Sequence, residues 1–245
     1  MSDNVYQIIQ SVLLAILAAY VVYYIYTLLF GNEYQPKLWK HYLKQKKIPP
    51  ELQAAERKYK DKTRFFNFWF QVERLKKDVP GAFAELGVYK GDSAHVLHLM
   101  DPSREFHLFD TFEGFTEKDL TAETGKAATY TKHNFADTSI ERVKEKLSSG
   151  KFVFHKGYFP DSTSGLDNNI RFALVNMDAD LYNPTKAGLE FFYPRLAPGG
   201  VIIIHDYNPD SPGIMKAVDE FAATIPEPIV PVTDSDSSVM IFKSK

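Results

Sequence analysis

The sequence predicts an α/β fold with a doubly wound, mostly parallel sheet, preceded by an N-terminal transmembrane helix. Short apolar runs alternate with amphipathic segments from residue 82 onward, and residues 5–30 contain no charged side chain. Strand–helix alternation is typical of a parallel sheet with helices on both faces, and a bilayer needs roughly 20 apolar residues. The 245 residues allow one such domain plus an appendage, and the lack of cysteine excludes disulfides and thiolate metal sites.

The apolar segment from Val5 to Phe30 is predicted to be an uncleaved single-pass anchor. The preceding MSDN has no basic residue and the run ends in bulky YTLLF, whereas a secretory signal has a basic start and a small-residue cleavage site. Four tyrosines towards one end suit an interfacial aromatic belt: Tyr20, Tyr23, Tyr24 and Tyr26. A buried or partner-binding helix is the alternative.

Residues 37–64 contain ten Lys or Arg and three acids. By the positive-inside rule this flank is cytoplasmic, and with it the rest of the chain. The basic cluster could also bind anionic headgroups of membrane lipids, with a solvated helix face as the alternative. The net charge of -2 suggests no nucleic-acid partner. We therefore expect an anchor over 1–31, a basic helical linker over 32–64 and a folded domain over 65–245.

The elements of that domain follow from apolar periodicity and capping residues. Helices are expected up to Met100, over 139–147 with Thr138 or Ser139 as cap, after Asn183 as cap with Pro184 in the first turn, and over 213–225. Strands are expected over 82–88, 105–110, 151–157, 170–178, 201–207 and, at the edge of the sheet, 238–244.

Ligands of open parallel sheets bind beyond the carboxyl ends of the strands. The first strand ends in ELGVYKGDS, residues 85–93, whose E-x-G-x-x-x-G spacing differs from the G-x-G-x-x-G of dinucleotide sites. Glu85 would repel a dinucleotide phosphate but suits an ammonium or sulfonium group. S-adenosylmethionine has both. A glycine turn without a ligand is the alternative.

The next two strand ends suit the rest of such a cofactor. Asp110 follows the glycine loop by about twenty residues, where an acid typically accepts hydrogen bonds from ribose hydroxyls. Gly157, Tyr158 and Phe159 offer a small residue and two rings that could flank an adenine. The alternatives are a helix-capping acid and ordinary aromatic packing.

Acidic residues lie at the ends of the fourth and fifth expected strands. Asp178 and Asp180 follow one strand, and His205 and Asp206 follow the next. Neighbouring strands lie about 4.8 Å apart, so Asp178 and Asp206 can converge on one cation if their strands are adjacent. A divalent ion would relieve their repulsion. Two capping or loop acids remain the alternative.

Several motifs at matching spacing then resemble the TylF-type (macrocin and mycinamicin) sugar O-methyltransferases, class I enzymes that depend on S-adenosylmethionine and Mg. The motifs are ELGVYKGDSA, FDTFEGF, MDADLYNPTKAGLEFFYPRLAPGGVIIIHDYN and GIMKAVDEF, within residues 65–245. The resemblance implies a Rossmann-like methyltransferase sheet. It implies that Glu85, Gly87 and Gly91 hold the methionine part of the cofactor and that Asp110 holds its ribose. The candidate cofactor residues are Glu85, Gly87, Tyr89, Gly91, Ser93, Asp110, Thr111, Phe112, Gly157, Tyr158 and Asp178.

The metal site is where this chain departs from the family. The resemblance assigns Asp178 to the metal, but the usual D-D-Y of the fifth strand is His205-Asp206-Tyr207 here. We expect Asp178, His205 and Asp206 to hold a divalent metal, Mg with Mn as the alternative, since imidazole binds Mg poorly and Mn well. His205 could instead supply a base.

The resemblance implies that the metal lowers the pKa of an acceptor sugar hydroxyl, which then attacks the sulfonium methyl. The polar segment 112–135 would cover the site, with Glu113, Phe115 and His133 as candidate contacts; a mobile polar loop is the alternative. The expected catalytic residues are Asp178, His205 and His133.

The anchor favours a lipid-linked glycan as the acceptor, with a glycosylated metabolite as the alternative. A homodimer is compatible with the sequence. Two other functions stay open: a membrane-tethered, nicotinamide-dependent sugar reductase, and a non-catalytic scaffold that retains the fold. The E-x-G-x-x-x-G spacing and the expected absence of a Tyr-x-x-x-Lys proton-transfer pair on a helix speak against the reductase, and the intact strand ends speak against the scaffold.

Overall fold

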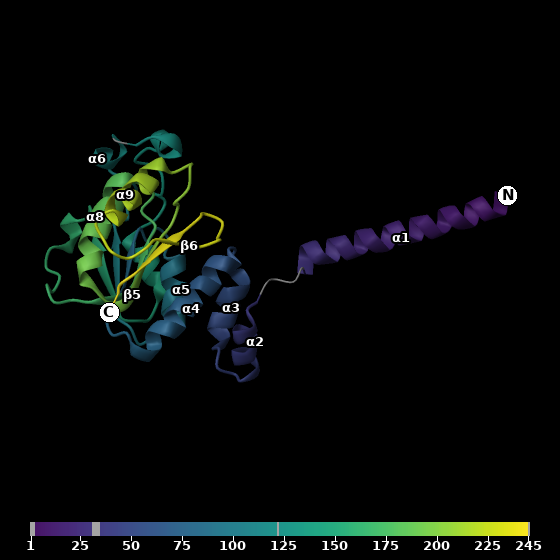
Figure 1. Ribbon diagram of the computed structural model, residues 1–245, viewed down its shortest axis with the longest axis horizontal. Coiled ribbons are helices and arrows are strands. Elements are labelled where there is room, and N and C mark those ends of the chain that lie inside the picture. The colour runs from purple at the N-terminus through teal and green to yellow at the C-terminus, as the bar shows by residue number, and fades with distance from the viewer. Residues whose placement is uncertain (1–2, 31–34, 122, 245) are drawn as a thin grey trace. The chain divides into compact units, whose positions relative to one another are not determined.

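The computed structural model describes residues 3–30, 35–121 and 123–244 (Figure 1). The chain forms two compact units, Met1–Gln45 and Lys46–Lys245. The first contains α1 (Asp3–Phe30) and α2 (Lys37–Lys44). Within the described residues, the stretch Asn4–Tyr26 of α1 is exposed throughout, with a mean hydropathy of 2.2, and is long and apolar enough to cross a membrane.

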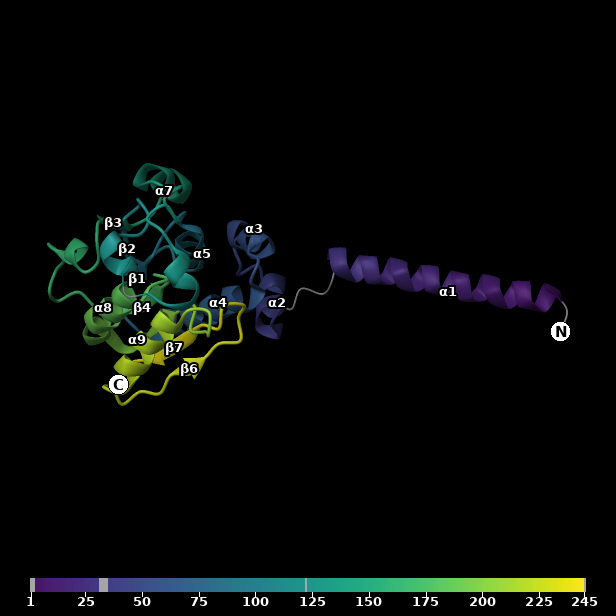
Figure 2. The ribbon, with the colours of Figure 1, turned by 90° about the horizontal axis from the view of Figure 1, so that it is seen from above.

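The second unit is a sheet between two layers of helices (Figure 2). Its strands are β1 (Ala82–Leu86), β2 (Phe106–Asp110), β3 (Phe152–Lys156), β4 (Phe172–Met177), β5 (Leu196–Ile204), β6 (Val230–Pro231) and β7 (Val239–Phe242). Its helices are α3 (Pro50–Lys58), α4 (Lys62–Asp78), α5 (Asp92–Met100), α6 (Glu117–Leu120), α7 (Ile140–Leu147), α8 (Tyr182–Phe192) and α9 (Pro212–Ala222), with 3-10 turns at Gly125–Thr129, Asp161–Thr163 and Tyr193–Arg195.

The strands lie in the order β3-β2-β1-β4-β5-β7-β6, and the first five are parallel. The chain reverses its direction of travel across the sheet between β1 and β4, which is where ligands of such sheets bind. Helices α4 and α5 lie side by side on one face of the sheet, and α8 and α9 on the other. Every residue of β1 and β4 is buried, because helices cover both faces of these central strands. The predicted fold class is confirmed.

Three sequence expectations differ from the observed elements. The last strand is not at the edge, because β7 lies between β5 and the two-residue β6. The fifth strand was expected over 201–207 but runs from Leu196 to Ile204, so residues 197–200 lie within β5. Asn183 does not cap α8: the helix begins at Tyr182, whose N–H donates to Glu123 Oε1 from a distant loop. Ser139 does cap α7, where its side chain accepts the N–H of Arg142.

Candidate functional site

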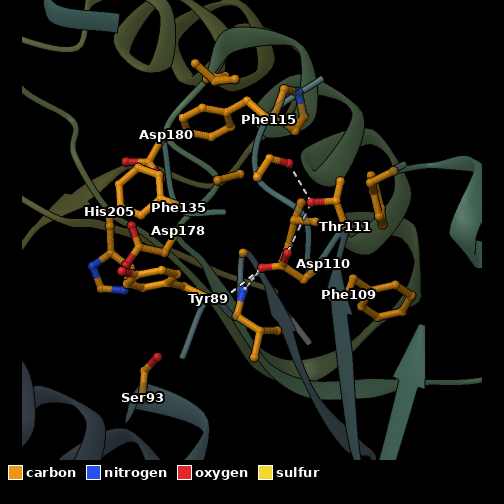
Figure 3. Close-up of a pocket in the computed structure, with 18 of the residues that line it drawn as sticks. Tyr89, Ser93, Phe109, Asp110, Thr111, Phe115, Phe135, Asp178, Asp180 and His205 are labelled. Carbon is orange, nitrogen blue, oxygen red and sulfur yellow. Dashed lines mark hydrogen bonds between the residues drawn. The ribbon is translucent and has the colours of Figure 1, made fainter. Parts of the chain in front are cut away.

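The carboxyl ends of four neighbouring strands meet at one edge of the sheet. Leu86 of β1 pairs with Phe109 of β2 and with Met177 of β4, which in turn pairs with Ile204 of β5. The residues that follow these pairs line a cavity of about 350 Å³. Figure 3 shows its walls, with Tyr89, Ser93, Asp110, Thr111, Asp178, Asp180 and His205 among the labelled side chains. This volume is in the range of small-molecule sites.

The loop between β1 and α5 forms one wall, and its glycines explain its path. Gly87 has a φ of 85°, and a Cβ there would lie 2.0 Å from the carbonyl oxygen of Asp178. Gly91 has a φ of 74° at the N-cap of α5. A side chain at Gly87 is therefore excluded both by the left-handed backbone and by β4. The loop can lie directly against the end of β4.

Glu85, near the end of β1, is completely buried. Its Oε1 accepts hydrogen bonds from the Ser93 hydroxyl and, at 2.8 Å, from Asn176 Nδ2. Its Oε2 is also buried and has no partner among the described residues. Burial raises the pKa of Glu85 to about 8. A cationic group that reached this oxygen would stabilise the carboxylate form, as an ammonium ligand does.

Asp110 joins the loops that follow β1 and β2. Its Oδ2 accepts the backbone N–H groups of Val88, at 2.7 Å, and Tyr89, at 2.8 Å, and its Oδ1 accepts that of Phe112 at 2.6 Å. Asp110 lines the cavity. Its proposed contact with ribose stays a prediction, and its observed role is to fix the two loops relative to each other.

Three carboxylates converge at the ends of β4 and β5. Asp178, Asp180 and Asp206 each offer an oxygen, and these atoms all lie within 4.8 Å of one another. Burial raises the pKa of all three, and the charge of Asp178 raises the pKa of the other two further. The pKa of Asp206 reaches about 7, although the Arg64 guanidinium opposes the rise. Such a set of partly buried oxygen ligands fits a hard divalent cation.

His205 does not join this cluster. It is 2% exposed, and both ring nitrogens are engaged: Nε2 lies 2.7 Å from Asn176 Oδ1 and Nδ1 lies 2.7 Å from Ser238 Oγ. No ring nitrogen is left for a metal or for an acceptor hydroxyl in this arrangement. The expectation that His205 is a ligand or a base therefore does not fit, and Asp180 replaces it in the set of converging groups.

The remaining sequence candidates divide by their place at the cavity. Phe112 is buried and its ring packs 6.1 Å from that of Phe154. Glu113 pairs with Lys156, and His133 is exposed, so the structure does not bring these two to the acids. The candidates that do not line the cavity are Glu85, Gly91, Phe112, Glu113, His133 and Asp206. Glu85 Oε1 accepts the hydroxyl of Ser93, which does line the cavity. The candidates that line the cavity are Gly87, Tyr89, Ser93, Asp110, Thr111, Phe115, Gly157, Tyr158, Phe159, Asp178 and His205.

Sequence reasoning missed two groups that line the cavity. Tyr59 and Arg64 come from the segment expected to be a linker, and Arg64 Nε lies 3.2 Å from Asp234 Oδ2. Phe135 lines the cavity from the segment that follows β2, with ring centroids 5.1 Å from Tyr89 and 5.4 Å from Phe115. A basic run and a polar loop gave no sign of these contacts, which depend on tertiary packing.

One further pair bears on the reductase alternative. The expectation that no helix holds a Tyr-x-x-x-Lys pair is wrong, because Tyr182 and Lys186 have this spacing on α8, with Lys186 Nζ 3.2 Å from the Tyr182 hydroxyl. The hydroxyl donates to Glu220 Oε2 on α9 at 2.7 Å. Neither residue is among those that line the cavity. The pair is therefore not placed for proton transfer at a cavity-bound substrate.

Known proteins match this chain over the same region. The model of the TylF family, macrocin O-methyltransferase, matches residues 60–242. A tetracenomycin-C 4'-O-methyltransferase of Streptomyces olivaceus, acting on the 8-demethyl-8-(2,3-dimethoxy-alpha-L-rhamnosyl) compound, is 31% identical over 161 residues, 60% of this chain and 61% of that protein. Mycinamicin III 3''-O-methyltransferase of Micromonospora griseorubida is 32% identical over 162 residues, 60% of this chain and 62% of its own. The matched region thus spans about three fifths of each relative.

Solved structures share the fold. The O-methyltransferase NovP superposes with a TM-score of 0.66 at 24% identity, over 75% of this chain and 81% of its own. The calicheamicin methyltransferase CalS11 superposes with a TM-score of 0.61 at 24% identity, over 74% of this chain and 78% of its own.

Proposed function

The chain belongs to the TylF (macrocin O-methyltransferase) family, and on that premise we propose that it transfers a methyl group from S-adenosylmethionine to a hydroxyl of a sugar-containing acceptor. The observation that supports this most is that Glu85, with its unpartnered buried oxygen, and the cluster of three carboxylates lie at the same edge of the sheet. Glu85 suits the ammonium of the cofactor. The carboxylate cluster suits a cation that binds a hydroxyl.

The residues around the cavity divide between cofactor and acceptor. Glu85 would hold the ammonium through its unpartnered Oε2, next to the cavity-lining Ser93 that donates to its Oε1. The loop around Gly87 would pass close to the methionine part, and Asp110 would face the ribose. Phe159 and Tyr158 provide rings beside the third strand end for the adenine. The unpartnered oxygen of Glu85 and the glycine conformations fit such a ligand.

Asp178, Asp180 and Asp206 would hold a divalent metal, Mg or Mn. When bound, the metal would lower the pKa of the acceptor hydroxyl. A carboxylate oxygen of this cluster that the metal leaves free would take up the hydroxyl proton, because the three carboxylates lie together where the acceptor hydroxyl would bind. The rings of Phe115 and Phe135 line the same cavity and would exclude water from it. Positioning of the hydroxyl against the methyl group supplies the rest of the rate.

The sugar class of the acceptor follows from the relatives, whose names refer to glycosylated tetracenomycin and to mycinamicin. The exposed apolar helix Asn4–Tyr26 and the basic residues after it extend the proposal to a single-pass membrane anchor with the domain on the cytoplasmic side. An anchored enzyme is best placed for a lipid-linked glycan.

The anchor proposal predicts that the full-length chain stays with membranes after an alkaline carbonate wash. It also predicts that removal of residues 1–31 slows methylation of a lipid-linked sugar in vesicles roughly tenfold or more, through the lost local concentration, and spares a soluble sugar. Equal rates on both acceptors without the anchor would exclude its role in substrate access.

The cofactor proposal is tested by thermal shift on the full-length chain. S-adenosylhomocysteine at 100 times its Kd should stabilise the domain by about 2.7 kcal/mol and raise the Tm by several degrees. NAD should leave the Tm unchanged. The opposite ranking would favour the nicotinamide reductase.

A further inference from the structure

His205 lies in a buried chain of hydrogen bonds that ends at Glu85. Its Nε2 contacts Asn176 Oδ1 at 2.7 Å, and Asn176 Nδ2 donates to Glu85 Oε1 at 2.8 Å. Asn176 and Glu85 are 0% exposed. The two residues pair directly across β1 and β4. On its other side, His205 Nδ1 meets Ser238, the residue before β7, which the antiparallel pairing of Ile204 with Val239 places next to His205.

The chemistry of these groups fixes the direction of the hydrogen bonds whenever Glu85 is ionised. A carboxylate only accepts, so Asn176 must turn its Nδ2 toward Glu85 and its Oδ1 toward His205. That oxygen also only accepts, so His205 must hold its proton on Nε2. The lone pair of Nδ1 then accepts from the Ser238 hydroxyl.

Ser238 can supply that proton, because its other neighbour has donors of its own. In the structure this hydroxyl donates to Asp234 Oδ2, so it has to turn to His205 Nδ1 when Glu85 ionises. Asp234 accepts the backbone N–H of Ser238 at 2.7 Å and Arg64 Nε at 3.2 Å. The carboxylate of Asp234 is therefore satisfied without the hydroxyl proton, and the chain from Ser238 to Glu85 can point in one direction.

We propose that His205 is a positioning residue for the cofactor: its Nε2–H fixes the Asn176 amide, which holds the Glu85 carboxylate in the orientation that binds the ammonium of S-adenosylmethionine. This rests on the proposed function, in which Glu85 binds that ammonium. An ionised carboxylate at position 205 would have no proton to offer Asn176 and could not fill this role. His205 thus serves the cofactor end of the cavity instead of the metal end.

The test compares two ligands on one set of full-length variants. The Kd of S-adenosylhomocysteine and the Kd of Mn²⁺ alone are measured by calorimetry for the wild type, His205→Phe, His205→Gln and Ser238→Ala. Gln offers an amide N–H near the place of Nε2, and Phe offers none. Asp206→Asn is the matched variant for the metal end.

His205→Phe should raise the Kd of S-adenosylhomocysteine roughly tenfold, the effect of one hydrogen bond to a buried polar chain. His205→Gln should stay within about threefold of the wild type, and Ser238→Ala should fall between them. The Kd of Mn²⁺ should rise in Asp206→Asn and stay unchanged in the His205 variants. In the S-adenosylhomocysteine complex, the ¹⁵N spectrum should show the Nε2–H tautomer of His205.

Three results would each overturn the inference. The first is an unchanged Kd of S-adenosylhomocysteine in His205→Phe, and the second is an equal rise of that Kd in His205→Phe and His205→Gln. The third is a raised Kd of Mn²⁺ in both His205 variants. If His205→Phe does not fold, the tautomer of His205 in the wild-type complex decides. The Nδ1–H tautomer would overturn the inference. The Nε2–H tautomer, together with a raised Kd of S-adenosylhomocysteine in Ser238→Ala, would uphold it. A wild type that binds no S-adenosylhomocysteine would instead contradict the proposed function.

Discussion

Replacing Asp178 by Ala is expected to lower the rate of methyl transfer by a factor on the order of 10² to 10³, the cost of removing a group that stabilises developing charge at the reacting atoms. Asp178 follows β4 at the centre of the cavity and belongs to the only three-carboxylate group found among the described residues. In the proposed mechanism its loss would remove one ligand of the cation and shift the acceptor. The measurement is the initial rate of methyl transfer, with Asp210→Asn, an exposed acid on the loop after β5, as the control.

A second variant, Asp206→Asn, separates the loss of activity from a loss of stability. Burial and neighbouring carboxylates raise the pKa of Asp206 from 3.8 to about 7. Between these values the folded state binds more protons than the unfolded state, so stability falls as the pH rises from about 4 to about 7. Without divalent metal, Asp206→Asn should therefore raise the Tm at pH 8 and have little effect at pH 4, while activity falls. A full rate in both Asp178→Ala and Asp206→Asn would contradict the metal site.

Replacing Glu85 by Gln is expected to raise the Kd of S-adenosylhomocysteine roughly 100-fold. The substitution keeps the shape of the side chain but removes the charge that would pair with the ligand ammonium, and truncating one partner of a buried charge pair typically costs 2–5 kcal/mol. Because the pKa of Glu85 is about 8, the unliganded protein holds this group largely neutral at pH 7, and Gln should not unfold it.

Calorimetry with the full-length chain gives the two dissociation constants, and the exposed Glu190→Gln on α8 serves as the control. A Glu85→Gln variant with wild-type affinity would place the ammonium elsewhere in the cavity. An equal loss in Glu190→Gln would show that the effect is one of overall charge.

The sequence predicted the parts of the site that depend on strand ends. Apolar runs that end at Glu85, Asp110 and Asp178 are local patterns, and the rule that parallel strands end at one edge brings these residues together. Asp178 and Asp206 lie together because β4 and β5 are neighbours, the condition on which their expected convergence depended. The strand ends could be predicted from the apolar pattern alone, whereas the order of the strands was not predicted.

The parts that were missed depend on contacts between distant segments. His205 looked like a metal ligand because its neighbour in sequence is Asp206, but its ring is held by Asn176 and by Ser238, which arrives with the antiparallel β7. Arg64 reaches the cavity because α4 meets the loop that contains Asp234. No periodicity in either segment encodes such a pairing.

The start of α8 shows the same limit on a smaller scale. Asn183 and Pro184 form a favourable capping sequence, yet the helix begins two residues earlier because Glu123 supplies an acceptor for the N–H of Tyr182. A side chain from a distant loop thus outcompetes the local cap. Local signals place an element, and tertiary partners decide its final residue.

The most direct test of the proposed activity is transfer of a labelled methyl group from S-adenosylmethionine to extracted lipid-linked glycans and to soluble glycosides by the full-length chain. The reaction is run with a chelator and again after Mg or Mn is restored. The account predicts labelled sugar product and S-adenosylhomocysteine in equal amounts, lost with the chelator, restored by metal, and lost in Asp178→Ala. Label that appears at the same rate in the chelated enzyme and in Asp178→Ala would contradict the metal-assisted mechanism, and binding of S-adenosylmethionine without transfer to any sugar would contradict the proposed activity.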